Sequence, residues 1–424
     1  MGNSVKSARI DAALTRHEVA DEAKCSLASV QNVEIGRAET WRIIERVVAA
    51  LNRLLSKKNR PLIESNLANV SKSWLQLPLK EWKVESVGPG ALLDPMYCVV
   101  KFHGLDRLDE LDRLVKWCLD ETSAPLKAYA AEGGMGKTRL ALELCLKMQK
   151  SYGWHVGFLR HESFPADGPH WRSINAFAKG LLVVVDYAGS PQKTPILQRL
   201  ILTLDSAPIK RIRLLMLDRD TLWLGRLRHN KHVADLLDGK TLANCDLKAR
   251  LGPAAKSKQE RCASFVEAAH AFAPFAHPKP YPGPIPNGPQ TPNSKIYERI
   301  LVLHMQALEV VNGGTESKTM TSVIRRALGR EREYWERMLP TRGIPGNLLL
   351  GVEEAVVGIG KAGGVRSKSE AVSLFRSLHR LADQSNAMLD QIAALLREIY
   401  PDDENGISPL QPDLLRHCLA DEWL

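Results

Sequence analysis

The segment AEGGMGKTRLALEL (residues 131–144) places several glycines directly before a lysine and a threonine. Glycine tolerates backbone conformations that other residues avoid, so such a run lets consecutive main-chain N–H groups turn toward one anion. Lys137 adds a positive charge, and the hydroxyl of Thr138 is a suitable ligand for Mg²⁺. These residue types at this spacing predict a cradle for the phosphates of a nucleotide.

The strict pattern for such a loop is G-x-x-x-x-G-K-[ST], and the chain departs from it at Ala131. An apolar segment precedes the loop, and Arg139-Leu-Ala-Leu-Glu-Leu opens a helix whose positive N-terminal end favours bound phosphate. The alternative is a glycine-rich turn with a chance Gly-Lys-Thr. The candidate nucleotide-binding residues are Ala131, Glu132, Gly133, Gly134, Met135, Gly136, Lys137, Thr138 and Arg139.

A carboxylate follows a wholly apolar run in LLVVVDYAG (residues 181–189). Asp186 at the carboxyl end of a buried strand is suited to hold Mg²⁺ through water, together with Thr138. The spacing predicts that this strand neighbours the one before the glycine-rich loop. Tyr187 stands where many vigorous ATPases keep a glutamate that activates water, so we expect at most slow ATP hydrolysis. An aspartate that only starts a turn is the alternative.

An arginine ends a second apolar run, RIRLLMLDRD (residues 211–220). Arg219 at a strand end can reach a terminal phosphate and report whether it is present; a solvated arginine at a strand end is the alternative. The candidate catalytic residues are therefore Lys137, Asp186 and Arg219, with Thr138 and Asp186 as the candidate metal ligands.

Short apolar runs alternate with longer amphipathic ones between residues 126 and 220. The runs 126–130, 154–159, 181–185 and 212–217 predict buried strands, and the intervening helical patterns predict a parallel sheet. One such helix is indicated by Leu197, Leu200, Ile201 and Leu204, with Ser190 as its expected cap. The central fold class is thus α/β.

The N-terminal segment LTRHEVADEAKCSLASVQNVEIGRAET (residues 14–40) predicts a helix-turn-helix, in which Ser26 caps the second helix while Val30 and Val33 face inward. Short polar residues on the outer face suit a DNA major groove. Residues 1–55 carry eight Lys or Arg against seven Asp or Glu, so a protein-docking use stays open. The candidate DNA-binding residues are Arg16, Leu27, Ala28, Ser29, Gln31 and Asn32.

Length and composition predict a multidomain protein without a membrane segment. The chain has 424 residues, 44% hydrophobic and 25% charged, with a net charge of +10. No secretion signal opens it, and the seven cysteines form no CxxC pair, so we expect a cytoplasmic protein with reduced thiols. The predicted divisions are a helix-turn-helix domain (1–55), a connector (56–100), a P-loop NTPase domain (101–270), a proline-rich linker (271–293), a helical domain (294–345) and a winged-helix-like domain (346–424).

Several segments together resemble the STAND class of signal-transduction P-loop NTPases, from about residue 85 to the end of the chain. They are FHGLDRLDELDRLVKWC, AEGGMGKTRLALEL, WHVGFL, LLVVVDYAG, RIRLLMLDRDTLW, GREREYWERMLP and IYPDDENGISPLQPDLLRHCL. The first 55 residues are similar to the Cro/repressor type of helix-turn-helix, with Glu34 and Gly36 at its usual Glu-x-Gly turn and Lys24 replacing its usual glycine.

The resemblance implies a switch in which a bound nucleotide clamps the NTPase core against a winged helix. A signal then releases the clamp, and protomers assemble through their NTPase faces. We therefore expect ATP and ADP with Mg²⁺ as ligands, self-association with ATP bound, and DNA binding as the output. The rivals are a DNA-binding regulator for which nucleotide is only structural, an anti-phage switch whose N-terminal helices recruit an effector protein, and an ordinary motor ATPase.

Overall fold

The computed structural model describes residues 6, 9–34, 41–58, 74–77, 79, 88–123, 125–160, 164, 179–203, 211–238, 246–250, 252–253, 255–276, 284–402 and 406–423. Their contacts divide the chain into two compact units. The sheet unit comprises Met1–Pro78, Arg113–Ala130 and Ala141–Ala249, and the helical unit comprises Leu79–Asp112, Ala131–Leu140 and Arg250–Leu424. The six domains predicted from the sequence are a different division and stay a prediction.

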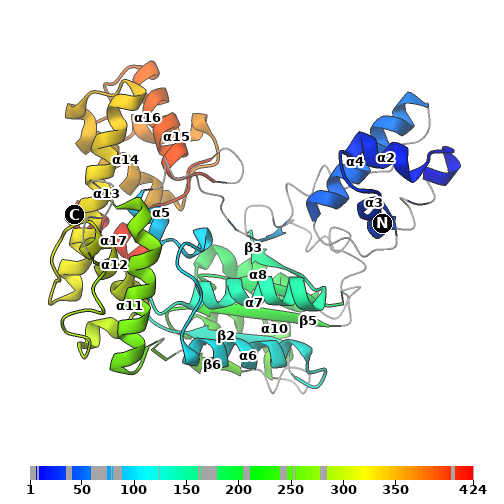
Figure 1. The fold of residues 1–424 in the computed structure, drawn as a ribbon, viewed down its shortest axis with the longest axis horizontal. Helices are drawn as coiled ribbons and strands as arrows, with labels where there is room; N and C mark the ends of the chain where they lie inside the picture. Colours follow the sequence, from blue (N-terminus) through cyan, green and yellow to red (C-terminus); the bar gives the residue numbers. More distant parts are fainter. Residues whose placement is uncertain are drawn as a thin grey trace. The chain divides into compact units, whose positions relative to one another are not determined.

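A six-stranded sheet has the strand order β1-β3-β4-β5-β2-β6. Strands β2, β3, β5 and β6 are labelled in Figure 1. Strands β2, β5, β4 and β3 pair in parallel, and β1 pairs with β3 in antiparallel orientation. The predicted α/β class with a parallel sheet is thereby confirmed. The strand bounds are β1 (Leu75–Gln76), β2 (Leu126–Ala130), β3 (His155–Leu159), β4 (Leu181–Val185), β5 (Ile212–Asp218) and β6 (Asp246–Arg250).

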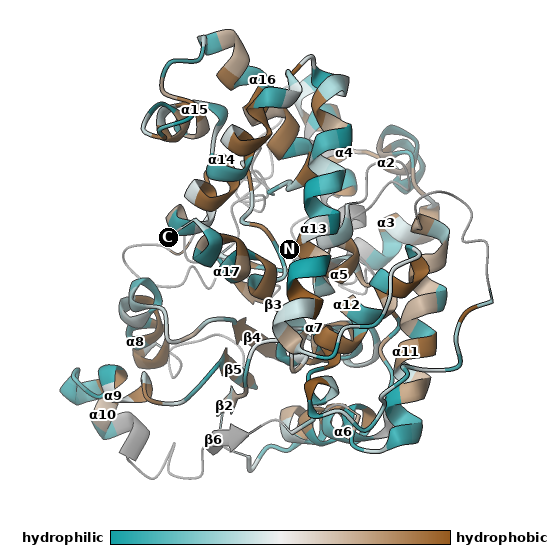
Figure 2. Ribbon diagram, turned by 90° about the vertical axis from the view of Figure 1, so that its left-hand side faces the viewer, coloured by the Kyte–Doolittle hydropathy of each residue, from teal (hydrophilic) through white to brown (hydrophobic). Residues whose placement is uncertain are grey.

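The central strands form where the sequence has continuous apolar runs. Every residue of β4 is buried, as are all residues of β5 before Asp218, because both faces of a parallel sheet are covered. Figure 2 shows both strands coloured mainly as hydrophobic. The four strands predicted from the sequence are confirmed, with bounds that differ by one residue in β3 and β5.

The predicted adjacency of the two motif strands is wrong. Strand β5 lies between β2, which leads into the glycine-rich loop, and β4, which leads to Asp186. In this register Ala130 at the end of β2 is opposite Asp218 at the end of β5. The apolar pattern of a strand reports its burial and says nothing about its partner, so the order of strands was not predictable from it.

Helix α8 (Thr194–Leu202) follows β4 and buries Leu197, Leu200 and Ile201, as the sequence predicted. Leu204 lies outside the described residues. The predicted cap is wrong, because Ser190 precedes the short 3₁₀ turn Pro191–Lys193 and makes no side-chain capping bond. The other helices here are α9 (Leu224–Leu227) and α10 (Lys231–Asp238), while α6 (Leu105–Leu119) and α7 (Lys137–Tyr152) each contribute residues to both units.

Three N-terminal helices have a small apolar core of their own: α2 (Arg16–Ala23), α3 (Leu27–Glu34) and α4 (Trp41–Lys57). The core contains Val19 and Val30, both 0% exposed, together with Leu51 of α4. A capping box between Thr15 and Glu18 begins α2. The side chain of Val33 and all of Gly36 lie outside the described residues.

The helical unit has one large apolar core, which includes Phe265, Tyr297, Trp335 and Phe375. In the described part of the chain, no helix is both long and apolar enough to cross a membrane. The helices are α5 (Pro89–Leu93), α11 (Lys258–Phe272), α12 (Ile300–Val311), α13 (Met320–Met338), α14 (Leu349–Ala362), α15 (Lys368–Arg376), α16 (Asn386–Ile399) and α17 (Asp413–Glu422).

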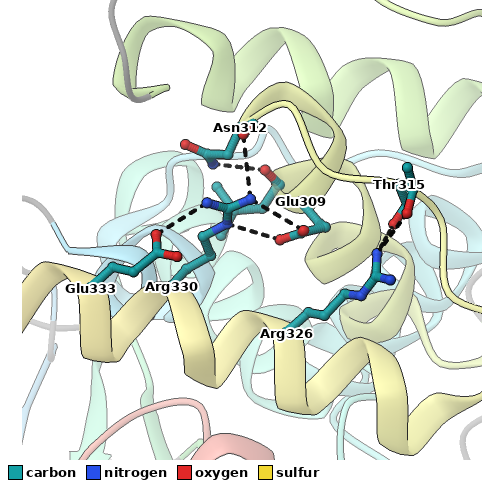
Figure 3. A network of polar contacts seen from close by, with 7 residues as sticks. Glu309, Asn312, Thr315, Arg326, Arg330 and Glu333 are labelled. Carbon is teal, nitrogen blue, oxygen red and sulfur yellow. Dashed lines mark hydrogen bonds and ion pairs between the residues drawn. The ribbon is translucent and has the colours of Figure 1, made fainter.

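Polar contacts fasten the connection between α12 and α13, as Figure 3 shows. The guanidinium of Arg330 donates to both carboxylate oxygens of Glu309, at 3.0 and 3.2 Å, and to Glu333 at 3.1 Å. Arg326 donates to the main-chain carbonyl and hydroxyl of Thr315 in the connecting segment. Because a paired arginine fork fixes orientation as well as distance, these contacts set α13 against α12.

Candidate functional site

The glycine-rich segment forms the turn between β2 and α7. Strand β2 ends at Ala130, and α7 begins at Lys137. Gly134 has φ +81° and Gly136 has φ +88°, the left-handed region that residues with a Cβ atom rarely adopt. The predicted strand-loop-helix context is thus present, and two glycines of the loop are required by the backbone itself.

The departure from the strict pattern at Ala131 has no backbone cost. Among the described non-glycine residues, only Ala13, Lys24, Cys98 and Tyr187 have positive φ, so Ala131 is in an ordinary conformation. Its side chain is buried, with 3% exposed. An alanine therefore fits this position, and the missing glycine does not argue against a phosphate-binding loop.

The carbonyl groups of the loop point toward hydrogen-bond donors. The bonds run from Lys137 Nζ to Ala131 O at 2.5 Å and to Glu132 O at 3.1 Å, from Leu301 N to Gly134 O at 3.1 Å, from Arg107 Nη2 to Met135 O at 2.8 Å, and from Leu140 N to Gly136 O at 3.0 Å. In a trans peptide the N–H points opposite to the preceding C=O. Each N–H that follows one of these carbonyls therefore points away from the donor that holds the carbonyl.

These N–H groups are the donors that an anion needs. Within the described chain, the N–H groups of Gly133 to Gly136 donate no main-chain hydrogen bond. Helix α7 starts directly after them, and its first turn adds the positive end of the helix dipole. Lys137 and Thr138 are both half-buried at this helix end. An ammonium, a hydroxyl and several main-chain N–H groups at a helix start are the groups that suit a magnesium-bound nucleotide phosphate.

Arg139, also predicted to bind nucleotide, has a different described contact. Its guanidinium donates to Pro95 O at 3.4 Å. Burial, the neighbouring His103 and the charge of Arg139 lower the pKa of His304 to about 3. The imidazole of His304 is therefore neutral near pH 7. A role of Arg139 in nucleotide binding stays a prediction.

Two helices from the C-terminal part of the chain contact the loop within the helical unit. Besides the bond from Leu301 N at α12, a Cβ atom placed on Gly134 would lie 3.1 Å from Leu301 Cβ. A Cβ atom on Gly133 would lie 3.4 Å from Leu414 Cδ2 and 3.8 Å from both carboxylate oxygens of Asp413, at the start of α17. A Cβ atom on Gly134 would press on Leu301, and one on Gly133 would be in ordinary contact with Leu414, so the loop packs closely against both helices.

The structure places Asp186 in the sheet unit, in a tight turn after β4. Tyr187 N donates to Asp186 Oδ1 at 2.9 Å, and Lys193 Nζ donates to Asp186 O at 2.6 Å. Tyr187 has φ +49°, an unusual conformation for a residue with a large side chain. Two polar contacts thus hold the backbone around this carboxylate, in a turn that contains one strained residue.

Asp218 supports the same turn, a role that the sequence analysis did not assign. Its Oδ2 accepts a hydrogen bond from Gly189 N, and its Oδ1 accepts one from Arg219 N at 2.6 Å. A Cβ atom on Gly189 would lie 2.6 Å from Asp218 Oδ2, so only glycine fits there. The signal was visible in the sequence, because Asp218 ends an apolar run as Asp186 follows one.

The predicted nucleotide site residues therefore fall into two groups. Residues 131–139 belong to the helical unit, whereas Asp186 and Arg219 belong to the sheet unit. Within its unit, Arg219 is exposed. The roles of these residues toward one nucleotide stay predictions.

The predicted DNA-binding residues lie at the starts of α2 and α3. Leu27, Ala28 and Gln31 are exposed, and Arg16, Ser29 and Asn32 are half-buried. Ser26 Oγ accepts from Ser29 N at 3.1 Å, which confirms the predicted cap. Lys24 ends α2 with φ +51°, the conformation that makes glycine the usual residue of this turn.

Comparison with known proteins gives structural similarity only. No protein-family model and no curated protein matches this chain. The chain is similar to the crystal structure of Cdc6p from Pyrobaculum aerophilum, with 15% sequence identity, a TM-score of 0.36, and coverage of 79% of this chain and 98% of that chain. It is also similar to the Aeropyrum pernix Orc1 protein in complex with DNA, with 13% identity, a TM-score of 0.33, and coverage of 78% and 96%. Both TM-scores are low, and neither similarity assigns a function to this chain.

Proposed function

We propose that this protein is a nucleotide-gated switch that binds Mg·ATP and Mg·ADP at the loop 131–138. One observation carries the proposal: the N–H groups of Gly133 to Gly136 donate no main-chain hydrogen bond within the described chain, and they directly precede Lys137 at the start of α7. Phosphate groups match these donors in charge and in acceptor number.

The proposed roles follow from the chemistry of each side chain. Lys137 neutralises phosphate charge, while Thr138 and Asp186 hold Mg²⁺, which supplies positive charge to the phosphate oxygens. Arg219 distinguishes ATP from ADP by contacting the terminal phosphate. Tyr187 has no carboxylate to activate water, so ATP hydrolysis is slow and serves to reset the switch.

The contacts of α12 and α17 with the loop support gating. A nucleotide that changes the loop alters the surface on which Leu301 and Leu414 pack. Near-complete switching requires the two nucleotides to differ by roughly 5.5 kcal/mol in their preference for the two states. A few charge-assisted bonds to one additional phosphate are of that order. This behaviour matches the STAND class, in which ATP favours self-association.

The proposed output is DNA binding by the first 55 residues, as in a transcription regulator of the cytoplasm. The exposed Leu27, Ala28 and Gln31 at the start of α3 support this output. The second candidate is an anti-phage switch whose N-terminal helices bind an effector protein or are controlled by a sensor protein. The near-neutral charge of residues 1–55 favours it.

The substitution Lys137→Ala tests the nucleotide site. We expect the wild-type chain to bind Mg·ADP and Mg·ATP in isothermal titration calorimetry and to gain mass by light scattering when ATP replaces ADP. Lys137→Ala should bind neither nucleotide and keep one mass, because the loop loses its only side-chain cation among residues 131–138. Lys150→Ala, an exposed position on the same helix, is the matched control. Unchanged ATP affinity in Lys137→Ala would refute the cradle.

A further inference from the structure

A buried arginine outside the motif contacts the glycine-rich loop. Arg107 lies on α6 and is 5% exposed. Its Nη2 donates to Met135 O at 2.8 Å and to Gly252 O at 2.7 Å. Nothing in the residue pattern of the loop indicates this partner, which lies 28 positions earlier in the chain. Burying a guanidinium costs free energy, because the group loses its hydration. The hydrogen bonds to these two carbonyls compensate for part of that loss.

We propose that Arg107 is a positioning residue for the nucleotide site, an inference that rests on the function proposed above. Met135 O and the N–H of Gly136 belong to one trans peptide and point in opposite directions. Because the guanidinium holds Met135 O, the N–H of Gly136 faces away from Arg107, toward the phosphates. Gly136 is a glycine with φ +88°, so this peptide can rotate when no such tie holds it.

A neighbouring ion pair helps to distinguish a role of Arg107 in positioning the loop from a role in simply holding α6 in place. Lys256 pairs with Asp106 at 2.9 Å and so already ties α6 to the segment that follows Gly252. Arg107 adds the bond to the loop, which this ion pair does not reach. Its effect should therefore be on the phosphates that the loop N–H groups hold, and these phosphates are shared by ADP and ATP.

The test compares two buried arginines of the helical unit that differ in their targets. Arg107→Met removes the donors with little change in volume. Arg261→Met is the control, because Arg261 is 8% exposed and also donates to carbonyls, those of Ala255, Pro292 and Ser294, away from the loop. Affinities for Mg·ADP and Mg·ATP are measured by calorimetry on the full chain, and thermal unfolding is measured without nucleotide.

We expect Arg107→Met to lower the affinity for both nucleotides by about tenfold or more, because a hydrogen bond from a charged group is lost. The ratio of the ATP affinity to the ADP affinity should stay unchanged. Arg261→Met should lose comparable thermal stability and keep both affinities. Arg107→Lys retains a charged donor but lacks the planar fork, so it should recover part of the affinity. This variant replaces Arg107→Met in the test if Arg107→Met does not fold.

Two outcomes overturn the inference. Affinities within twofold of wild type in the Arg107 variant would show that the bond to Met135 O does not position the loop. Equal affinity losses in the Arg107 and Arg261 variants would show that general destabilisation is the cause. Either result leaves the proposed function intact when the wild-type chain binds nucleotide and Lys137→Ala does not. A wild-type chain that binds no nucleotide overturns both proposals.

Discussion

At the scale of single residues, backbone conformation explains where glycine is needed and where it is not. Gly134 and Gly136 have positive φ, whereas Ala131 occupies an ordinary conformation and replaces glycine without strain. Tyr187 shows the opposite case, a bulky residue with positive φ beside the proposed metal ligand Asp186. Strained residues persist only where their surroundings hold them, and here Asp218 and Lys193 do so.

The turn after β4 gives a prediction at this scale. Gly189→Ala should lower the free energy of unfolding by about 1 to 3 kcal/mol, because its Cβ would meet Asp218 and Trp223 within 3 Å. Gly225→Ala is the control: nothing lies within 4 Å of its Cβ, and alanine favours the helix. Urea denaturation followed by circular dichroism measures both. Equal stability of the two variants would contradict the close packing of this turn.

At the scale of elements, a buried carboxylate joins α13 to two other segments of the helical unit. Glu331 is 0% exposed and accepts hydrogen bonds from Gly90 N at 2.6 Å and from Tyr400 OH at 2.5 Å. Trp335 Nε1 in turn donates to Tyr400 OH at 2.6 Å. Burial raises the pKa of Glu331 to about 6, although both hydrogen bonds act in the opposite direction.

Stability should therefore depend on pH through Glu331. The folded-state pKa lies above its ordinary value of 4.5, so the contribution of this group is fully present below pH 4.5 and is lost as the pH rises through 6. Relative to Glu331→Gln, the wild-type chain should lose about 2 kcal/mol of unfolding free energy between pH 4.5 and 7.5. Urea denaturation at several pH values measures the difference. A pH-independent difference would show that the carboxyl does not titrate in this range.

At the scale of the whole molecule, the proposed switch couples nucleotide state to the N-terminal helices. The loop 131–138 packs with α12 and α17 in the helical unit, whereas α2, α3 and α4 have a separate core. Because their core is separate, we expect the N-terminal helices to present the same surface in either nucleotide state. The nucleotide state would then determine how many copies of that surface bind DNA at the same time, because an assembled protein binds through several modules at once.

DNA binding by the full chain tests this coupling. In the presence of ATP, we expect the chain to bind double-stranded DNA of random sequence with an affinity that falls steeply as the salt concentration rises. In the presence of ADP, we expect the affinity to be lower. Arg16→Ala should reduce the salt slope by about one phosphate contact, whereas Lys150→Ala should not change it. Fluorescence anisotropy across a salt series measures the slope. Absent or salt-independent binding would instead favour an effector protein as the partner of α3.

The local sequence determined which segments form strands, where the glycine-rich turn lies and how α2 and α3 begin. Continuous apolar runs report burial on both faces, as in β4, and caps such as Thr15 and Ser26 act on residues only three positions away. These effects act between residues that are close together in the sequence, so the sequence alone was sufficient to predict them.

Only the tertiary structure decided which of these parts meet. It placed β5 between β2 and β4, set Arg107 on Met135 O, and brought Gly90 to Glu331 across 241 positions. It also packed Leu301 and Leu414 against the glycines of the loop. Such contacts depend on the packing of whole elements, and no spacing of residues along the chain specifies which distant donor will satisfy a given carbonyl or carboxylate.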